Sequence, residues 1–571
     1  MDFDQTIRRI LILFPICFAA CLLCFDTTSG LSFHGITAPL LTSFVISWVT
    51  AYIPQPFRGF VQLLFGELLI GICIIDRYCQ DFFATPITPQ ILSNVLLSDA
   101  RETHEFISTF LGFHVFSHWR IATLLVLSLT LPIALFLDNK CERQFKLGGK
   151  MWLIVLAICM VCEVRPLYKF MQLFCQHRDL QNMEGLIFRH YHEEIPTPLH
   201  RFAFACYSLK QSEHVLANIK LSTFSAQIDS CSYQSPHIVL VIGESYNKHH
   251  SALYGYHLPT TPLQQKRSDN GELFVFDNVV SPWNITSNVF LDIFSLWEYG
   301  MISTIDKMPL FPMLFRKAGY SVNFFSNQYL LKGFRKGATN QAGHFFLADI
   351  EMSDSLFSFR NRKSSKFDLG LIEQVEQFKE EHQKQAYTLD IIHLVGQHFD
   401  YSLRCPQTYR AFSLEDYADK TIDVDAKKII MQYDNATHYN DIVLDRIITT
   451  YEHKEAIVLY VADHGEEVYD ELPIHGRLFQ EPTVIQARYE FEVPMWIWCS
   501  SSFQEKHPDM VSAIRSSTSK PFLTDGLPQV LLYLAGIKCE WRDDSRNVLS
   551  PGYQPKPRII GGCADYDKLT K

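Results

Sequence analysis

The sequence predicts an N-terminal α-helical membrane domain followed by an α/β domain with a mainly parallel central sheet. The first prediction depends on long apolar runs, which fall almost entirely before about residue 170 of the 571-residue chain. The second depends on short apolar strands that alternate with helical stretches from about residue 235 onward. The formal net charge of −10 argues against a nucleic-acid partner, because binding to nucleic acid usually requires a basic face.

Five apolar runs are candidates for membrane-spanning helices. A spanning helix needs about 20 largely apolar residues, and the first four runs approach that length while the fifth is shorter. The first run lacks a small-residue cleavage site, so we expect an anchor rather than a cleaved signal peptide. We therefore predict about five transmembrane helices within residues 1–170. The runs lie at about residues 10–26, 36–53, 57–75, 120–137 and 151–164.

The positions of Lys and Arg predict how the chain is oriented. Arg8 and Arg9 precede the first run, and the segment 138–150 carries four further basic residues. With five spans these two basic segments lie on the same side, which is expected to be the cytoplasm. The later part of the chain then lies on the opposite side of the membrane, which is the periplasm in a Gram-negative cell. We interpret residues 171–234 as bridging helices and linker, and residues 235–571 as a periplasmic catalytic domain.

The second part of the chain contains near-continuous apolar strands, which indicate a parallel sheet covered on both faces. Ligands bind such sheets beyond the carboxyl ends of the strands. Three of the strands deliver Glu244, His393 with His398, and Asp463 with His464 at or after these ends. The predicted strands lie in segments 237–245, 321–328, 387–398, 456–465 and 491–500.

Glu244, Asp463 and His464 together predict a metal site. Like charges in a small space repel one another, and a bivalent cation relieves that repulsion. Two carboxylates and one imidazole are a common ligand set for catalytic Zn²⁺, with a fourth position left open. Each residue alone has an ordinary explanation, such as a helix cap. Their expected meeting at one edge of the sheet favours metal binding.

Thr286 is the candidate nucleophile, because it lies where a loop meets a helical pattern. A hydroxyl at a helix N-terminus is well placed to attack phosphate, since the free N–H groups and the helix dipole stabilise the anion. The alternative is that Thr286 or the following Ser287 is only the N-cap of the helix. Position in the sequence does not decide between these two roles.

Several blocks resemble those of the membrane-anchored phosphoethanolamine transferases of the alkaline phosphatase and sulfatase superfamily. VIGESYNKHHSALYGYHLPTTPLQQ resembles their GES…LYGY…TTP block, FDNVVSPWNITS their nucleophile segment, HLVGQHFDYSLRCP their His-containing loop and VADHGEEVYD their second metal segment. The blocks occur in the family's order, and the resemblance covers nearly the whole chain. HGEEVYD and YDNATHYND make the branch that acts on the lipopolysaccharide core the closest likeness.

The resemblance implies an alkaline-phosphatase-like fold for the C-terminal domain and a role for each matching residue. It implies that Zn²⁺ is bound by Glu244, Thr286, Asp463 and His464, with Thr286 as the nucleophile. It implies that the phosphate and substrate site is lined by His393, His398 and His475. Lys332 is a further candidate for substrate binding, although its sequence context departs from the family. Arg488 either binds acceptor phosphate or supports the fold.

The activity implied is a zinc-dependent transfer of phosphoethanolamine from phosphatidylethanolamine through a covalent threonine intermediate. The acceptor is expected to be lipopolysaccharide, at a core sugar or lipid A, or another lipid-linked surface glycan. A multi-pass protein of a bacterial inner membrane is implied. The alternatives are a glycerophosphotransferase that uses phosphatidylglycerol and a catalytically inactive scaffold. A sulfatase is disfavoured, because the Cx[PA]xR context of formylglycine formation is missing near Thr286.

Overall fold

Two compact units make up the chain. They comprise Met1–Gln211 with Leu478–Gln480, and Ser212–Arg477 with Glu481–Lys571. The computed structural model describes residues 3–25, 33–54, 57–89, 91–92, 95, 115, 117–138, 149–175, 197–328 and 346–571.

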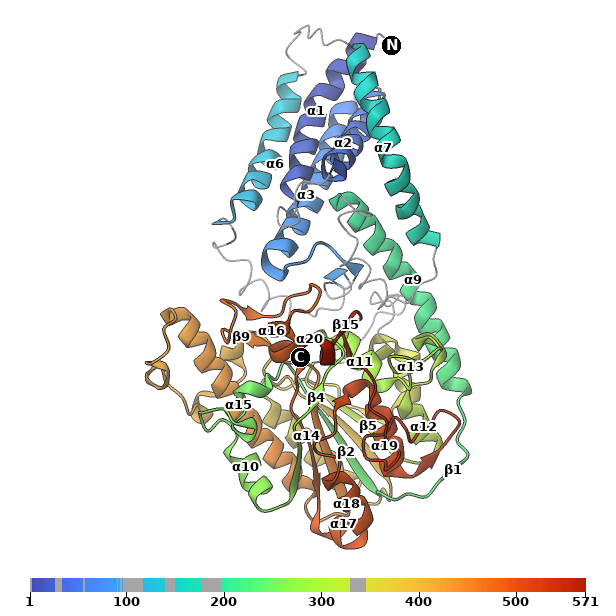
Figure 1. Cartoon of the computed structure of the whole chain (residues 1–571), viewed down its shortest axis with the longest axis vertical. Helices are drawn as coiled ribbons and strands as arrows, with labels where there is room; N and C mark the ends of the chain where they lie inside the picture. The colour runs from blue at the N-terminus through green and yellow to red at the C-terminus, as the bar shows by residue number, and fades with distance from the viewer. Residues whose placement is uncertain are drawn as a thin grey trace. The chain divides into compact units, whose positions relative to one another are not determined.

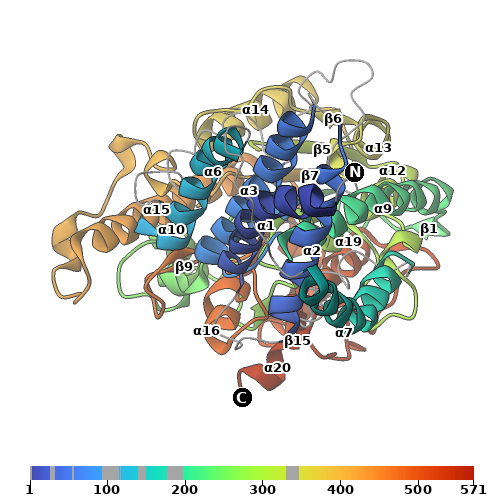
Figure 2. The same cartoon turned by 90° about the horizontal axis from the view of Figure 1, so that it is seen from above.

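The N-terminal unit is helical, and each of the five predicted apolar runs falls on a helix. Helices α1, α2 and α3 pack side by side (Figures 1 and 2). Apolar side chains of α1, α3 and α6 form a common buried core. The helices are α1 (Phe3–Leu23), α2 (Phe33–Ala51), α3 (Arg58–Phe83), α6 (Trp119–Asp138) and α7 (Gly149–Cys175), and α9 (Pro198–Ser225) runs from this unit into the second.

Within the described residues, two helices are long and apolar enough to cross a membrane. They are α3, over Arg58–Phe83, and the Trp119–Phe136 part of α6. The apolar helical stretches Leu13–Leu23 and Gly35–Ala51 are shorter. A helical N-terminal region is therefore confirmed, whereas the number of five spans stays a prediction.

A buried ion pair joins α3 to α9 inside the N-terminal unit. Nε of Arg201 donates to Oδ1 of Asp76 at 2.9 Å, and both side chains are almost completely buried. A charge removed from water is tolerated when a partner of opposite sign and hydrogen bonds compensate it. This pair therefore fixes the start of α9 against α3.

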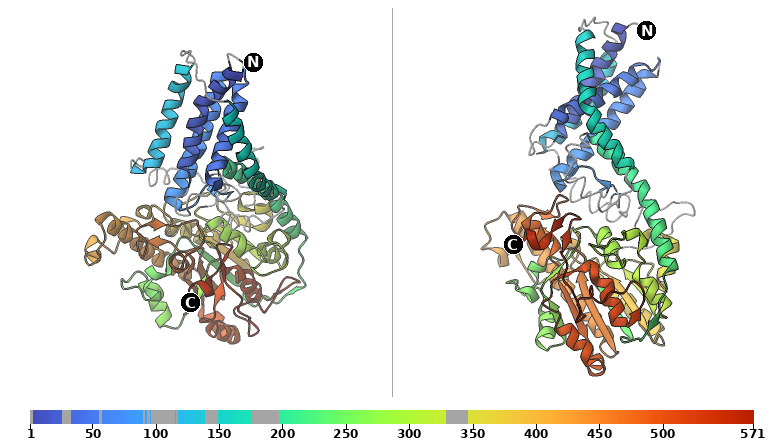
Figure 3. Two further views of the ribbon diagram at one scale, coloured as in Figure 1. Left: turned by 45° about the horizontal axis from the view of Figure 1, so that its top comes forward. Right: turned by 45° about the vertical axis from the view of Figure 1, so that its right-hand side comes forward.

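The second unit is built on a seven-stranded sheet with the order β3-β11-β8-β2-β7-β5-β6. The right-hand view of Figure 3 shows strands of this unit with helices around them. The pairs among β8, β2, β7, β5 and β6 are parallel, whereas β11 is antiparallel to both of its neighbours. The predicted, mainly parallel sheet is thus confirmed. The strands are β2 (His237–Gly243), β3 (Leu273–Phe276), β5 (Ser321–Ser326), β6 (Phe359–Arg360), β7 (Thr388–His393), β8 (Ala456–Ala462) and β11 (Met495–Cys499).

Helices cover both faces of this sheet. Every residue of β7 and of β8 is buried, which requires packing on each side because successive side chains point to opposite faces. The α-helices of the second unit after α9 are α10 (Pro262–Asp269), α11 (Thr286–Phe294), α12 (Phe311–Lys317), α13 (Ile350–Leu356), α14 (Asp368–Glu381), α15 (Val424–Tyr451), α16 (Val484–Gln486), α17 (Ser501–Lys506), α18 (Pro508–Arg515), α19 (Leu527–Ala535) and α20 (Tyr566–Leu569).

Short two-residue strands complete the unit. Strand β9 pairs with β10 in an antiparallel ribbon that follows the end of β8. The short strands are β1 (Ser230–Cys231), β4 (Val279–Val280), β9 (Glu467–Val468), β10 (His475–Gly476), β12 (Phe522–Leu523), β13 (Ile537–Lys538), β14 (Ile559–Ile560) and β15 (Ala564–Asp565).

The loop after β8 requires a glycine at position 465. A Cβ added there would lie 2.2 Å from the carbonyl oxygen of Tyr489, which is a backbone atom and cannot rotate away. We therefore expect Gly465→Ala to destabilise the second unit by about 1–3 kcal/mol through overpacking. Thermal unfolding of the full chain, followed by tryptophan fluorescence, measures the shift in melting temperature.

Gly552→Ala is the matched control, because a Cβ there meets Ser550 at an ordinary contact distance of 3.5 Å. Equal melting temperatures for the two variants would contradict the close approach of the two backbone segments.

Candidate active site

The register of the parallel strands brings the two acidic strand ends together. Gly243 of β2 lies opposite Ala462 of β8, so the residues that follow, Glu244 and Asp463, emerge side by side. Pairing continues past the strands, because the backbone N–H of Asp463 donates to the carbonyl of Gly243 at 3.0 Å. Two segments more than 200 residues apart in sequence therefore deliver carboxylates to one point.

Ser245 holds the turn after Glu244 in an unusual conformation. Its φ of +54° lies in the left-handed region, which a residue other than glycine adopts at a cost. Three hydrogen bonds compensate: its N–H donates to Oδ1 of Asp463 at 3.0 Å, its hydroxyl donates to Glu244, and its carbonyl accepts from Tyr433. The strain is located where Glu244 must turn toward Asp463.

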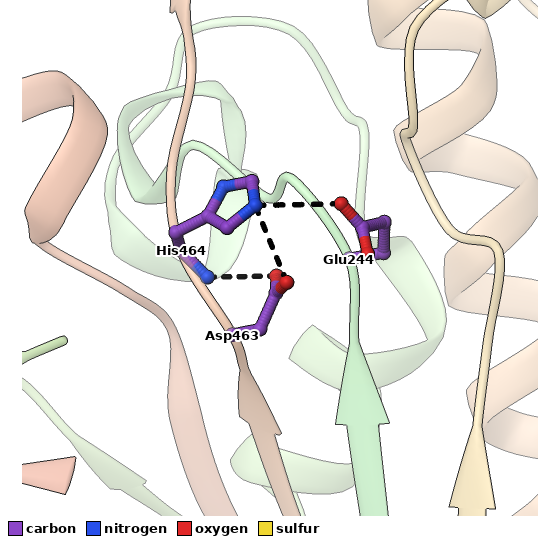
Figure 4. Close-up of side chains that lie close together, drawn as sticks. All are labelled: Glu244, Asp463 and His464. Atoms are coloured by element: carbon purple, nitrogen blue, oxygen red, sulfur yellow. Dashed lines mark hydrogen bonds and ion pairs between the residues drawn. The ribbon is translucent and has the colours of Figure 1, made fainter. Parts of the chain in front are cut away.

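Glu244, Asp463 and His464 form a buried group of ligand atoms (Figure 4). One ligand atom from each residue lies within 4.8 Å of the others. Nε2 of His464 is 3.4 Å from Oε1 of Glu244 and 3.3 Å from Oδ2 of Asp463. This spacing leaves room for one cation between three converging ligands.

Two further observations fit a metal at this point. Nδ1 of His464 lies 2.8 Å from the carbonyl oxygen of Gly465, so the N–H on Nδ1 donates there and the lone pair of Nε2 faces the carboxylates. Oδ2 of Asp463 is buried and accepts no hydrogen bond from the described residues. A buried carboxylate oxygen without a donor is costly, and a metal ligand bond removes that cost.

The two carboxylates differ in their tendency to ionise. Burial, reinforced by the nearby charge of Glu244, raises the pKa of Asp463 well above its ordinary value. Burial also opposes ionisation of Glu244, but the contacts of His393 and His464 hold its pKa well below the ordinary value. The pair therefore resists carrying two negative charges, and a divalent cation stabilises the doubly ionised state.

Thr286 is directed into this group rather than used as a helix cap. It is the first residue of α11, whose N-cap is Ile285, and no side chain caps the helix. Oγ1 of Thr286 lies 3.3 Å from Oε2 of Glu244 and 3.2 Å from Nε2 of His464. The hydroxyl is thus available for chemistry beside the anion-favouring N-terminus of α11.

The three predicted histidines occupy different positions. His393 is buried, and its Nε2 lies 4.0 Å from Oε2 of Glu244. His398 keeps some exposure but is largely enclosed by the protein, and this enclosure lowers its pKa to about 3, although the charge of Glu244 opposes that shift. His475 is partly exposed on β10, and its Nδ1 lies 3.3 Å from the hydroxyl of Tyr469.

The two predicted substrate-binding residues are less informative. Lys332 lies outside the described residues. The guanidinium of Arg488 is about half exposed and forms an ion pair with Glu471 at 3.1 Å. Its role in substrate binding stays a prediction.

Besides Ser245, sequence reasoning missed two residues whose side chains contact the group. Nε2 of Gln328 donates to Oε2 of Glu244 at 3.0 Å. Nη1 of Arg477 lies 2.6 Å from Nε2 of His464 and donates to the carbonyl of Asn284 at 2.9 Å. Gln328 is the last residue of the predicted strand segment 321–328, which ends at the same edge of the sheet. Its position in the sequence could therefore have identified it as a site residue. Arg477 carries no such signal beyond its place after His475-Gly476.

Comparisons with known proteins found one matching family model and several similar proteins. A protein-family model described as Sulfatase matches residues 236–533. Phosphoethanolamine transferase EptC of Escherichia coli (strain K12) is 26% identical over 344 residues, which are 58% of this chain and 57% of that protein. Kdo(2)-lipid A phosphoethanolamine 7''-transferase of the same strain is 24% identical over 490 residues, 82% of this chain and 79% of that protein. The match to EptC thus spans little more than half of that relative.

Solved structures share the fold. The membrane protein lipooligosaccharide phosphoethanolamine transferase A (EptA) from Neisseria meningitidis has a TM-score of 0.60 at 18% identity, over 96% of this chain and 98% of that one. The C-terminal periplasmic domain of EcEptC from Escherichia coli, in a complex with Zn, has a TM-score of 0.51 at 23% identity, over 60% of this chain and 96% of that one. The predicted fold, a helical N-terminal region and an alkaline-phosphatase-like domain, is therefore confirmed.

If the three residues bind a metal, the metal stabilises the second unit. At a Zn²⁺ concentration 100 times the dissociation constant, the expected gain is about 2.7 kcal/mol, which raises the melting temperature of the wild-type chain. Asp463→Asn should lose that response, because it removes one anionic ligand. Thermal unfolding with Zn²⁺ and with a chelator measures both.

Asp269→Asn, at an exposed carboxylate at the end of α10, is the control and should respond to Zn²⁺ like wild type. A full Zn²⁺ response in Asp463→Asn would show that the metal binds elsewhere.

Proposed function

The chain belongs to the sulfatase family, and from this membership and the site we propose that it is a zinc-dependent phosphoethanolamine transferase. Its donor is phosphatidylethanolamine. Its acceptor is a lipopolysaccharide core sugar or lipid A. Relatives that are named phosphoethanolamine transferases support the transferred group.

One observation carries the proposal: the hydroxyl of Thr286 faces Glu244 and His464 at the N-terminus of α11. A hydroxyl that does not cap its helix and that lies beside a predicted metal site is the arrangement that nucleophilic attack on phosphorus requires. A sulfatase reaction is not supported, because the Cx[PA]xR motif is missing near this threonine.

The residues that fit Zn²⁺ are Glu244, Thr286, Asp463 and His464. When bound, the metal neutralises the negative charge that builds up on the transferring phosphoryl group and favours the ionised form of the hydroxyl. The Zn complex of the EptC domain supports the choice of metal. The buried, undonated Oδ2 of Asp463 supports the choice of site.

The chain's own groups then account for a double displacement. Oγ1 of Thr286 bonds to the phosphorus while the bond from phosphorus to the diacylglycerol oxygen breaks. The proton that leaves the Thr286 hydroxyl passes to a nearby imidazole among His393, His398 and His475, which delivers it to the diacylglycerol oxygen. The hydroxyl of an acceptor sugar or of an acceptor phosphate monoanion next attacks the phosphorus, and its proton passes to Oγ1 of Thr286 as the bond from phosphorus to that oxygen breaks. N–H groups at the start of α11 stabilise the anion in both steps.

The helical N-terminal unit accounts for the lipid donor. Helix α3 and the Trp119–Phe136 part of α6 are long and apolar enough to cross a membrane. We propose that residues 1–170 form a multi-pass domain with five spans in a bacterial inner membrane, followed by bridging residues 171–234 and a periplasmic catalytic domain over 235–571. A second candidate donor, phosphatidylglycerol, would transfer glycerophosphate through the same threonine.

The proposal is tested by a transfer assay on the full chain in nanodiscs. With Zn²⁺ and lipopolysaccharide, labelled headgroup should move from phosphatidylethanolamine to the acceptor. Thr286→Ala should lower the rate by about 10³-fold or more, since it removes the nucleophile. Thr449→Ala, which removes an exposed hydroxyl hydrogen-bonded within α15, should keep the wild-type rate.

Transfer from phosphatidylglycerol but not from phosphatidylethanolamine would favour the second candidate. Undiminished transfer by Thr286→Ala would overturn the assignment of the nucleophile.

A further inference from the structure

Arg477 contacts both the segment that precedes the predicted nucleophile and one of the predicted metal ligands. It directly follows β10 and its side chain is only partly exposed. Nη1 donates to the carbonyl of Asn284, which is two residues before Thr286, at 2.9 Å. The same nitrogen lies 2.6 Å from Nε2 of His464. One guanidinium thus bridges the nucleophile segment and the metal-binding imidazole.

The surroundings of Arg477 are strongly acidic. Glu466, Glu244, Asp463 and Glu490 all act electrostatically on its guanidinium, and each is at most 1% exposed. Arginine remains protonated in proteins, so this positive charge is permanent. The guanidinium and a divalent cation therefore compensate the same buried carboxylates.

The contact with His464 restricts what Arg477 and a metal can do together. Nδ1 of His464 donates to Gly465, which leaves a single lone pair on Nε2. That lone pair either accepts the N–H of Arg477 or binds a metal, but not both. A metal at Nε2 would therefore release this N–H of Arg477, while the bond to the carbonyl of Asn284 keeps the guanidinium against the segment that carries Thr286.

We propose that Arg477 is a phosphate-binding residue of this site and that metal binding makes its guanidinium available. The ligand is the anionic phosphoryl group at Thr286, to whose non-bridging oxygens the released N–H donates. Guanidinium geometry matches two phosphate oxygens, which a lysine ammonium does not. The identity of the donor lipid in this inference rests on the proposed function, whereas phosphate binding itself does not.

The inference predicts opposite effects of one substitution on two ligands. Arg477→Gln removes a positive charge and a competitor for Nε2, so Zn²⁺ should bind about tenfold tighter or more. The Zn²⁺-loaded variant should bind inorganic phosphate at least about tenfold more weakly, because a charged donor is lost. Isothermal titration of the full chain in detergent, first with Zn²⁺ and then with phosphate, measures both affinities.

Two further variants keep the test decisive. Arg477→Lys retains the buried charge and should fold even if Arg477→Gln does not, with weaker phosphate binding and a smaller change in Zn²⁺ affinity. Arg446→Gln removes an exposed arginine of α15 that pairs with Glu376, and should leave both affinities unchanged. A structural role for Arg477 alone would lower the melting temperature without these opposite shifts.

The outcomes separate this inference from the proposed function. Wild-type phosphate affinity in the folded Arg477 variants overturns the inference, even if transfer from phosphatidylethanolamine is observed in the wild-type chain. Tighter Zn²⁺ with weaker phosphate supports it, even if phosphatidylethanolamine proves not to be the donor. Weaker Zn²⁺ binding in Arg477→Gln also overturns it, because the competition for Nε2 would then be wrong.

Discussion

The meeting of two buried carboxylates, Glu244 and Asp463, is the constraint on which the site depends. The parallel register of β2 and β8 makes them neighbours, and both are at most 1% exposed. Two such charges cannot be held together in a protein interior without compensation. Two neighbouring groups contribute to that compensation, because Gln328 donates a hydrogen bond and Arg477 supplies a positive charge. A divalent cation completes the same balance.

The backbone around the carboxylates is arranged to allow this closeness. Ser245 adopts a positive φ so that Glu244 turns back toward β8. A Cβ at Gly396, which also has a positive φ, would lie 2.9 Å from the carbonyl oxygen of Glu244. At Gly465, which follows β8, a Cβ would also lie too close to a backbone atom, the carbonyl oxygen of Tyr489. Small residues and local strain therefore concentrate where ligand atoms converge, as expected for a site organised before its ligand arrives.

Much of the fold and the centre of the site could be predicted from the sequence. Long apolar runs indicate helices that are buried or in contact with lipid. Apolar strands that end in Glu244 and Asp463-His464 indicate the edge of the sheet at which a ligand binds. Periodicity says nothing of strand direction when both faces are buried, so the antiparallel pairing of β11 was not predicted. Arg477 was missed for another reason: its contacts reach Asn284, 193 positions away, and a single charge in a loop has no local pattern.

Sequence reasoning also could not decide whether Thr286 caps its helix or acts as the nucleophile. A threonine at a helix start fits both a cap and a nucleophile, and only the direction of its hydroxyl separates them. The structure turns Oγ1 toward Glu244 and His464 and leaves the N-cap position to Ile285. The central claim is that this hydroxyl carries the transferred group.

Intact mass spectrometry tests that claim most directly. The full chain is incubated with Zn²⁺ and phosphatidylethanolamine without acceptor, beside Thr286→Ala. The account predicts a mass increase equal to one phosphoethanolamine group on the wild-type chain, located on Thr286 by peptide fragmentation and missing from the variant. The same adduct on Thr286→Ala, or its location on another residue, would contradict it.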